Sequence, residues 1–283
     1  MNQLRMVGEI PFHPEHSSNS TRKPKNFSWH TEFGVCDVWI DNGIIQGANE
    51  PYHSRKYGWF LESRAIKPQL FMWLQQNYES VLNQYEGIFT CDKELVKLDP
   101  MRFILSPPGS CLPWVNPTEY AIYNKTKLCS MIASAKQMSP GHLLRHQVAQ
   151  KMLDAGVHVV GGACGTPKIG LDSGRIHPNK ISALGDFMFH VVVENCQYDN
   201  YFTEKLTDCF ATGTVPIYLG CPSIGEHFNT DGMLFLDEEG NFDISSLNAD
   251  RYYGMMPAIE DNLNRVRKLQ GADDFIWQTI GNS

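Results

Sequence analysis

The sequence predicts an α/β protein made of two Rossmann-like domains in tandem. Apolar runs with strand character alternate with apolar residues at helical spacing in both halves of the chain, which is typical of parallel sheets covered by helices. One complete strand–helix–strand unit lies between Phe187 and Gly220. The 283 residues are enough for two such domains. We expect domains over residues 1–125 and 126–257, followed by a helical segment over 258–283.

Strand and helix signals alternate through the first half. The expected strands span 1–12, 35–40, a short stretch near Ile44, 87–91 and 102–105. Gly58–Ile66 is an apolar segment that delivers Glu62 just before a helix, for which Pro68 suits the first position. Asp92 is placed to cap a further short helix. Residues 107–117 are rich in chain-breaking residues, so we expect a linker or cleft-lining loop there.

The second half continues this alternation. Ser139 and Pro140 form a strong helix start, a cap followed by a first-position proline, and Gly156 ends that helix. The unit from Phe187 to Gly220 contains a buried strand, a polar loop, a short helix with a glycine at its end, and a second strand. The other expected elements are strands over 128–133 and 157–160, a loop over 161–179 and a final helix over 258–269.

The helix of that unit is expected to carry a polar face. Tyr201, Glu204, Lys205 and Asp208 are spaced i, i+3, i+4 and i+7, so a helix would place them on one side. Ligands bind such units at the carboxyl ends of the strands, and a helix N-terminus favours anions. The pattern therefore indicates an anion site, whereas the plain alternative is a solvated helix face.

Composition excludes several classes of protein. A formal charge of -7 and a pI near 5.8 argue against a protein that coats nucleic acid, although a local basic pocket for a nucleotide remains compatible with both. No apolar stretch reaches membrane-spanning length, and the first residues lack a signal-peptide core. The eight cysteines form no CxxC pair, so we interpret them as reduced. We expect a soluble cytoplasmic protein without a membrane anchor.

The segment ENCQYDNYFTEKL, residues 194–206, resembles the donor-binding motif of the α-1,3-fucosyltransferase family. The matching residues are Glu194, Asn195, Tyr201, Thr203, Glu204, Lys205, Gly213, Val215, Pro216 and Gly220. The resemblance covers about 127–229. It implies a GT-B fold with two Rossmann-like domains facing a cleft, an inverting glycosyl transfer and GDP-fucose as donor. Exostosin-like and algal-virus glycosyltransferases are similar, and their donors include pentoses such as UDP-xylose.

The resemblance also assigns the domains. The N-terminal domain would bind an oligosaccharide or glycoprotein acceptor, the C-terminal domain would bind the nucleotide sugar, and the last helix would pack back toward the first domain. The helix reads EKLTDCF where family members often have a tryptophan after the leucine, and the first domain matches loosely. The donor therefore stays open between fucose and xylose. A non-catalytic sugar-binding protein of the same fold is the other alternative.

Donor binding falls to residues of the second domain. A leaving nucleoside diphosphate needs cations and backbone donors, which Lys205 and the helix dipole can supply. The resemblance implies that Arg145 binds the diphosphate, that Asn195 and Tyr201 hydrogen-bond the donor, and that Glu204 accepts hydroxyl protons. Glu194, in the matched motif, and Ser134, in the loop after the first strand of this domain, are further donor-binding candidates.

The resemblance also implies a base in the first domain, and the sequence gives no sign of a metal site. Glu62 is the expected general base for the acceptor hydroxyl, with Glu32, Asp37 and Asp92 as competitors. Trp114 is the candidate for stacking on an acceptor sugar. The sequence has no DxD triplet and no cluster with zinc spacing, so we expect no cofactor other than the nucleotide sugar and metal-independent transfer.

Overall fold

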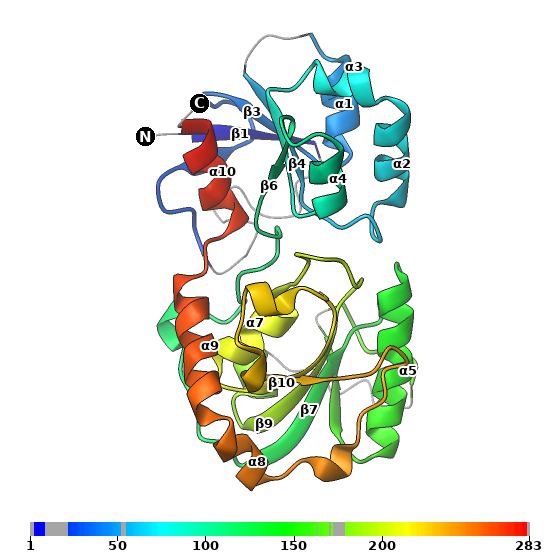
Figure 1. Ribbon diagram of the computed structural model, residues 1–283, viewed down its shortest axis with the longest axis vertical. Helices are drawn as coiled ribbons and strands as arrows, with labels where there is room; N and C mark the ends of the chain where they lie inside the picture. The colour runs from blue at the N-terminus through cyan, green and yellow to red at the C-terminus, as the bar shows by residue number, and fades with distance from the viewer. Residues whose placement is uncertain are drawn as a thin grey trace. The chain divides into compact units, whose positions relative to one another are not determined.

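The computed structural model describes residues 3–8, 22–51, 55–162, 164–169, 171 and 179–281. The chain divides into two compact units (Figure 1). The first comprises Met1–Cys111, Asp199–Tyr201 and Gln270–Ser283, and the second comprises Leu112–Tyr198 and Phe202–Leu269. Each unit contains a parallel sheet with helices, so the predicted α/β class is confirmed.

The first unit is built on a parallel sheet with strand order β2-β1-β3-β4-β5-β6. The strands are β1 (Gln3–Gly8), β2 (Ser28–His30), β3 (Asp37–Ile40), β4 (Lys56–Phe60), β5 (Gly87–Thr90) and β6 (Phe103–Leu105), and the helices are α1 (Gly43–Asn49), α2 (Pro68–Gln76), α3 (Tyr78–Leu82), α4 (Lys93–Leu98) and α10 (Ala272–Gly281). Side chains alternate between the faces of a strand. Val38 and Ile40 therefore pack with α10, whereas Trp39 packs with α1, α2 and α3, and both faces of the sheet are covered.

The docking of α10 onto the first unit provides a stability prediction. Asp273, in the first turn of α10, accepts a hydrogen bond from Trp29 Nε1 at 2.8 Å, and both side chains are buried. Asp273→Ala should lower the free energy of unfolding by about 1–3 kcal/mol, because it removes the acceptor of a buried N–H. Chemical denaturation followed by tryptophan fluorescence measures this change.

The matched control is Glu94→Ala, since the Glu94 side chain is 64% exposed and pairs with an exposed lysine. That substitution should change the free energy of unfolding by no more than about 0.5 kcal/mol. Equal effects of the two substitutions would contradict a buried Asp273–Trp29 tie.

The second unit is built on a parallel sheet with strand order β11-β10-β9-β7-β8. The strands are β7 (Lys127–Ala133), β8 (His158–Gly161), β9 (Phe187–Val193), β10 (Val215–Leu219) and β11 (Leu234–Phe235), and the helices are α5 (Pro140–Asp154), α6 (Lys180–Leu184), α7 (Glu204–Ala211), α8 (Ala249–Gly254) and α9 (Met256–Lys268). Short 3-10 turns span Pro117–Glu119, Ile224–Glu226, Thr230–Gly232 and Ile244–Ser246. Because the strands are parallel, α5 and α7 begin at the edge of the sheet where β7 and β9 end (Figure 1).

Most predicted elements of the second unit are confirmed. The strand Phe187–Val193 has the predicted bounds, Ser139 caps α5 with Pro140 at its first turn, and Gly213 follows α7 with φ +65°. The helical position of Tyr201 was wrong. Thr203 has an extended backbone (φ -130°, ψ -177°) and its side chain caps α7 by accepting from the Lys205 amide, so the helix begins at Glu204 and Tyr201 precedes it.

One other element differs from the sequence-based expectation. The stretch near Ile44 begins a helix, α1, and not a strand. The predicted domain boundaries after residues 125 and 257 stay predictions. The compact units change after Cys111, and α9 belongs to the second unit and α10 to the first. The expected strand over 1–12 and the expected loop over 161–179 lie partly outside the described residues.

Candidate functional site

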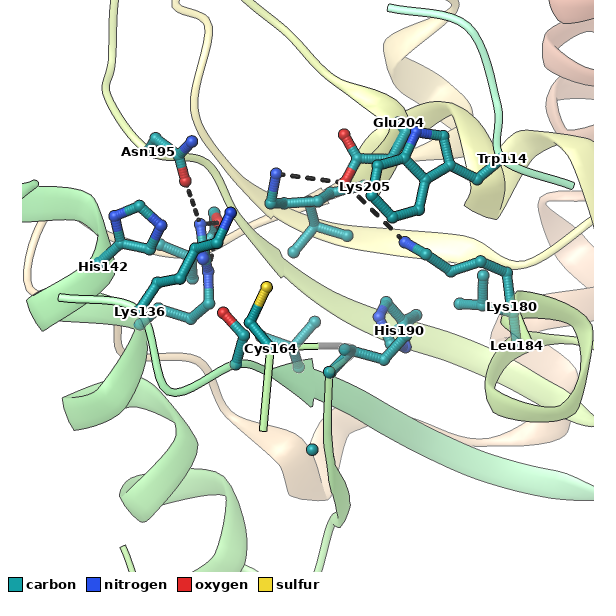
Figure 2. Close-up of a pocket in the computed structure, with 18 of the residues that line it drawn as sticks. Trp114, Lys136, His142, Cys164, Lys180, Leu184, His190, Asn195, Glu204 and Lys205 are labelled. Atoms are coloured by element: carbon teal, nitrogen blue, oxygen red, sulfur yellow. Dashed lines mark hydrogen bonds and ion pairs between the residues drawn. The ribbon is translucent and has the colours of Figure 1, made fainter. Parts of the chain in front are cut away.

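A cavity of about 280 Å³ lies in the second unit at the carboxyl ends of β7, β8 and β9. Figure 2 shows its lining side chains. Lys136, His142 and Asn195 gather toward one side, Trp114, Lys180 and His190 toward the other, and Lys205 and Glu204 lie along the upper wall. The charged residues among the described lining residues are Lys136, Arg145, Lys180, Lys205 and Glu204. The cavity is therefore suited to an anion.

Arg145 ties helix α5 to the end of β9. Its side chain is buried, and its Nε and Nη2 donate to the Val193 carbonyl at 2.9 and 2.6 Å. Nη2 also donates to Asn195 Oδ1 at 2.9 Å. The guanidinium thus brings positive charge to the cavity wall and, since Oδ1 is the acceptor, turns the Asn195 amide so that its nitrogen is the outward donor.

The first turn of α5 packs tightly against the loop after β9. A Cβ built on Gly141 would lie 2.4 Å from the carbonyl oxygens of Glu194 and Asn195, so only glycine fits there. Ser139 Oγ lies 3.1 Å from the Asn195 carbonyl and 2.8 Å from His142 Nδ1. Burial, and then the charges of Arg145 and Lys205, lower the pKa of His142 to about 4. His142 is therefore neutral at pH 7 and takes part by hydrogen bonding.

Helix α7 begins in a network of charged groups. Glu194 is buried, and its two carboxylate oxygens accept from the Thr203 amide at 2.9 Å and the Thr203 hydroxyl at 2.8 Å. Lys205 Nζ lies 3.1 Å from Thr203 Oγ1, 3.4 Å from Glu204 Oε1 and 3.9 Å from Glu194 Oε2. Burial raises the pKa of Glu194 and Lys205 opposes that rise. Glu194 thus braces the start of α7 beneath Lys205, and it is not among the lining residues.

The sequence-based prediction missed Lys180. Its Nζ lies 2.9 Å from Asp208 Oδ2, 4.0 Å from Glu204 Oε1 and 5.1 Å from the centre of the Trp114 ring. Asp208 Oδ1 in turn accepts from the Trp114 amide at 2.7 Å and the Val115 amide at 3.0 Å, which fixes the proline-rich loop against α7. The available signals were the helix-capping Asn179 before Lys180 and the polar position of Asp208 on α7.

The charges around Glu204 decide its protonation state. Burial would raise its pKa, but Lys205 and Lys180 outweigh burial and the pKa is lowered. Glu204 is therefore a carboxylate at neutral pH, able to accept hydrogen bonds from hydroxyl groups. Trp114 is 41% exposed and also lines the cavity. Ser134 lines it too, with its carbonyl 2.8 Å from His146 Nε2.

Two predicted residues lie in the first unit. Tyr201 is buried there and is not among the lining residues of the cavity. Glu62 follows β4 and is half-buried. The Leu61 and Glu62 amides both donate to Asp41 Oδ1, at 3.0 and 3.2 Å, and Asp41 is a buried carboxylate that sequence reasoning did not select.

The competitors of Glu62 have other surroundings. Asp37 forms a two-point ion pair with Arg5, and Asp92 caps α4 while pairing with Arg64. Glu32 is exposed.

Among the described residues, no three His, Cys, Asp or Glu side chains gather where they could hold a metal ion. In that same part of the chain, no helix has the length and apolar character needed to cross a membrane.

Comparisons with known proteins show what the part of the chain around this cavity is similar to. Residues 122–230 match the model described as glycosyltransferase family 10 (fucosyltransferase) C-term. The chain is 28% identical over 151 residues to the α-(1,3)-fucosyltransferase FucT of Helicobacter pylori, covering 51% of this chain and 30% of that protein. It is 26% identical over 193 residues to the 4-galactosyl-N-acetylglucosaminide 3-α-L-fucosyltransferase 9 of Bos taurus, covering 65% of this chain and 50% of that protein.

The alignments to these two relatives thus span half of their length or less. Among solved structures, an α1,3-fucosyltransferase with GDP aligns with 88% of this chain and 83% of its own, at 14% identity and a TM-score of 0.48. The matched residues 122–230 include β7, α5, β9 and α7, the elements that supply Arg145, Asn195 and Lys205. The predicted resemblance to the fucosyltransferase family is confirmed.

Proposed function

We propose, from the family 10 fucosyltransferase match of residues 122–230, that this chain is a glycosyltransferase that moves fucose from GDP-fucose to a hydroxyl of a glycan, with inversion. The observation that carries the proposal is a cationic cavity built from the matched residues themselves. The helical spacing of the polar residues from Tyr201 to Asp208 indicated an anion site. The structure adds a cavity of about 280 Å³, and hydrogen bonds that hold Arg145 and Lys205 in its wall.

The donor diphosphate is proposed to bind at Lys205 and Arg145. Negative charge grows on the bridging oxygen as the sugar leaves, and a fixed cation stabilises that charge most strongly in a water-poor site. Glu204, as a carboxylate, accepts from donor hydroxyls, and Asn195 donates from an amide oriented by Arg145. Glu194 holds the start of α7 in place by accepting hydrogen bonds from Thr203. Ser134 and Tyr201 are kept as proposed donor contacts, and Trp114 as the proposed acceptor contact.

Glu62 is the proposed general base. Its carboxylate takes the proton of the acceptor hydroxyl while the hydroxyl oxygen attacks the anomeric carbon of fucose. The bond from that carbon to the phosphate oxygen breaks, and GDP leaves with the electron pair. Attack on the face opposite the leaving group inverts the anomeric centre.

We expect transfer to be independent of divalent metal, because Lys205, Arg145 and the helix N-termini supply the positive charge that the diphosphate requires. Initial rates with GDP-fucose, measured with and without EDTA, should agree within about two-fold (about 0.4 kcal/mol in barrier). Loss of activity in EDTA that added Mg²⁺ or Mn²⁺ restores would contradict this expectation.

The function is tested by turnover. Purified protein is incubated with GDP-fucose or UDP-xylose and a 4-galactosyl-N-acetylglucosaminide, the acceptor in the name of the bovine relative. Fucosylated product with an inverted anomeric centre, identified by mass spectrometry and NMR, is the expected result. Product formed with UDP-xylose and not with GDP-fucose would identify UDP-xylose as the donor. Glycan binding without turnover of either donor would support a non-catalytic sugar-binding protein.

A further inference from the structure

Asp41 joins the exits of two neighbouring strands in the first unit. It follows β3 directly, and its Oδ1 accepts from the amides of Leu61 and Glu62, which follow β4. The two strands pair in parallel, with Ile40 opposite Trp59. One side chain therefore holds the backbone of the residue proposed as general base, at the edge of a parallel sheet where ligands bind.

The turn that presents Asp41 is itself tightly held. Asp41 is 2% exposed and has φ +47°, a conformation that aspartate tolerates better than most residues. Its amide donates to the Trp59 carbonyl at 3.0 Å, and its carbonyl accepts from the Ile44 amide at 2.9 Å. A Cβ on Gly43 would lie 2.8 Å from the Cα of Gly8, so the end of strand β1 and the start of helix α1 approach closely beside this turn.

We propose that Asp41 is a positioning residue that fixes the Leu61–Glu62 backbone and thereby aims the Glu62 carboxylate. The proposal rests on the proposed function, in which Glu62 is the base. A buried carboxylate that only stabilised the fold would affect the amount of active protein, but its effect would not depend on whether Glu62 can accept a proton. That difference makes the role measurable.

Asparagine is the appropriate conservative replacement. Burial raises the pKa of the Asp41 carboxyl to about 7, and repulsion from the Glu62 carboxylate adds to that rise. The hydrogen bonds from the Glu62 and Leu61 amides and the attraction of Lys67 lower the pKa but do not cancel the rise. The protonated form is therefore well populated at neutral pH. Asparagine keeps the Oδ1 acceptor without a charge, as that form does, whereas alanine removes the acceptor from both amides.

The experiment is a double-mutant cycle of Asp41→Ala with Glu62→Gln, assayed with GDP-fucose and a 4-galactosyl-N-acetylglucosaminide. In the wild-type background Asp41→Ala should lower kcat about 10- to 100-fold with the KM for GDP-fucose unchanged, because a misplaced catalytic group loses rate and not donor binding. In the Glu62→Gln background the same change should cost less than about three-fold, because there is no longer a base to aim. Asp41→Asn should retain at least about a third of kcat (about 0.65 kcal/mol in barrier).

The control is Asp99→Asn, the same chemical change as Asp41→Asn, at a carboxylate of the first unit that accepts from the Tyr78 hydroxyl. It should leave kcat unchanged. Equal losses from Asp41→Ala in both backgrounds, or an Asp41→Asn variant as slow as the alanine variant, would overturn the positioning role. If the alanine variant does not fold, Asp41→Ser replaces it, since its hydroxyl is one bond shorter than Oδ1.

The two proposals fail in different ways. A wild type that transfers no fucose from GDP-fucose overturns the proposed function, and the role of Asp41 with it. If the wild type transfers fucose but Asp41→Ala lowers kcat by the same factor in the wild-type and Glu62→Gln backgrounds, only the role of Asp41 is overturned.

Discussion

Lys205→Ala should lower kcat/KM for GDP-fucose about 100- to 1,000-fold, which is the usual loss when one group that stabilises developing charge is removed. Lys205 is held near Thr203 and Glu204 at the start of α7, so its ammonium is ordered before the donor arrives. Removing it also leaves the Glu204 carboxylate without its nearest cation on α7, which makes the cavity less favourable to a diphosphate. GDP binding measured by calorimetry should become undetectable in the same variant.

Two variants test whether the charge is the cause. Lys205→Arg keeps a cation and should retain part of the GDP affinity. Lys127→Ala removes an exposed lysine at the beginning of β7, outside the cavity, and should leave GDP binding unchanged. A Lys205→Ala protein that binds GDP within about three-fold of wild type (about 0.65 kcal/mol) would remove Lys205 from the donor site.

Glu62→Gln should lower kcat about 100- to 10,000-fold, the usual contribution of a general base. The amide keeps the shape of the side chain and cannot accept the proton, so the loss is chemical. GDP affinity should stay unchanged, because the proposed donor residues that line the cavity lie in the second unit. Steady-state kinetics and calorimetry on the same preparation separate the two effects.

Glu32→Gln is the matched control, since Glu32 is an exposed glutamate of the same unit and was itself a candidate base. It should be as active as wild type. An inactive Glu32→Gln protein beside an active Glu62→Gln protein would transfer the role of base to Glu32.

The sequence predicted the backbone of the candidate site well, because strong local signals specify it. A seven-residue apolar strand, a serine cap before proline and a glycine after a short helix each act within a few residues, and all three appear at their predicted positions. The helical spacing that included Tyr201 was wrong, since the extended backbone of the cap residue Thr203 separates Tyr201 from the helix that begins at Glu204.

Contacts distant in sequence could not be predicted in this way. Lys180 meets Asp208 and the Trp114 ring only once the sheet is assembled, and no local pattern relates these three positions. Asp41 was not selected from the sequence, because only the pairing of β3 with β4 brings the Leu61 and Glu62 amides to it. The burial of Glu194 and its hydrogen bonds to Thr203 likewise form only in the folded chain, so the motif alone did not predict them.

Calorimetric titration of GDP and UDP into the purified protein tests the central claim most directly. Because the proposed donor is GDP-fucose and its proposed site is the cavity of the second unit, GDP should bind with a stoichiometry of one and at least about ten-fold more tightly than UDP, a difference of about 1.4 kcal/mol. Lys205→Ala should remove the GDP signal. Tighter binding of UDP, or no binding of either nucleotide by the folded protein, would contradict a GDP-fucose site in this cavity.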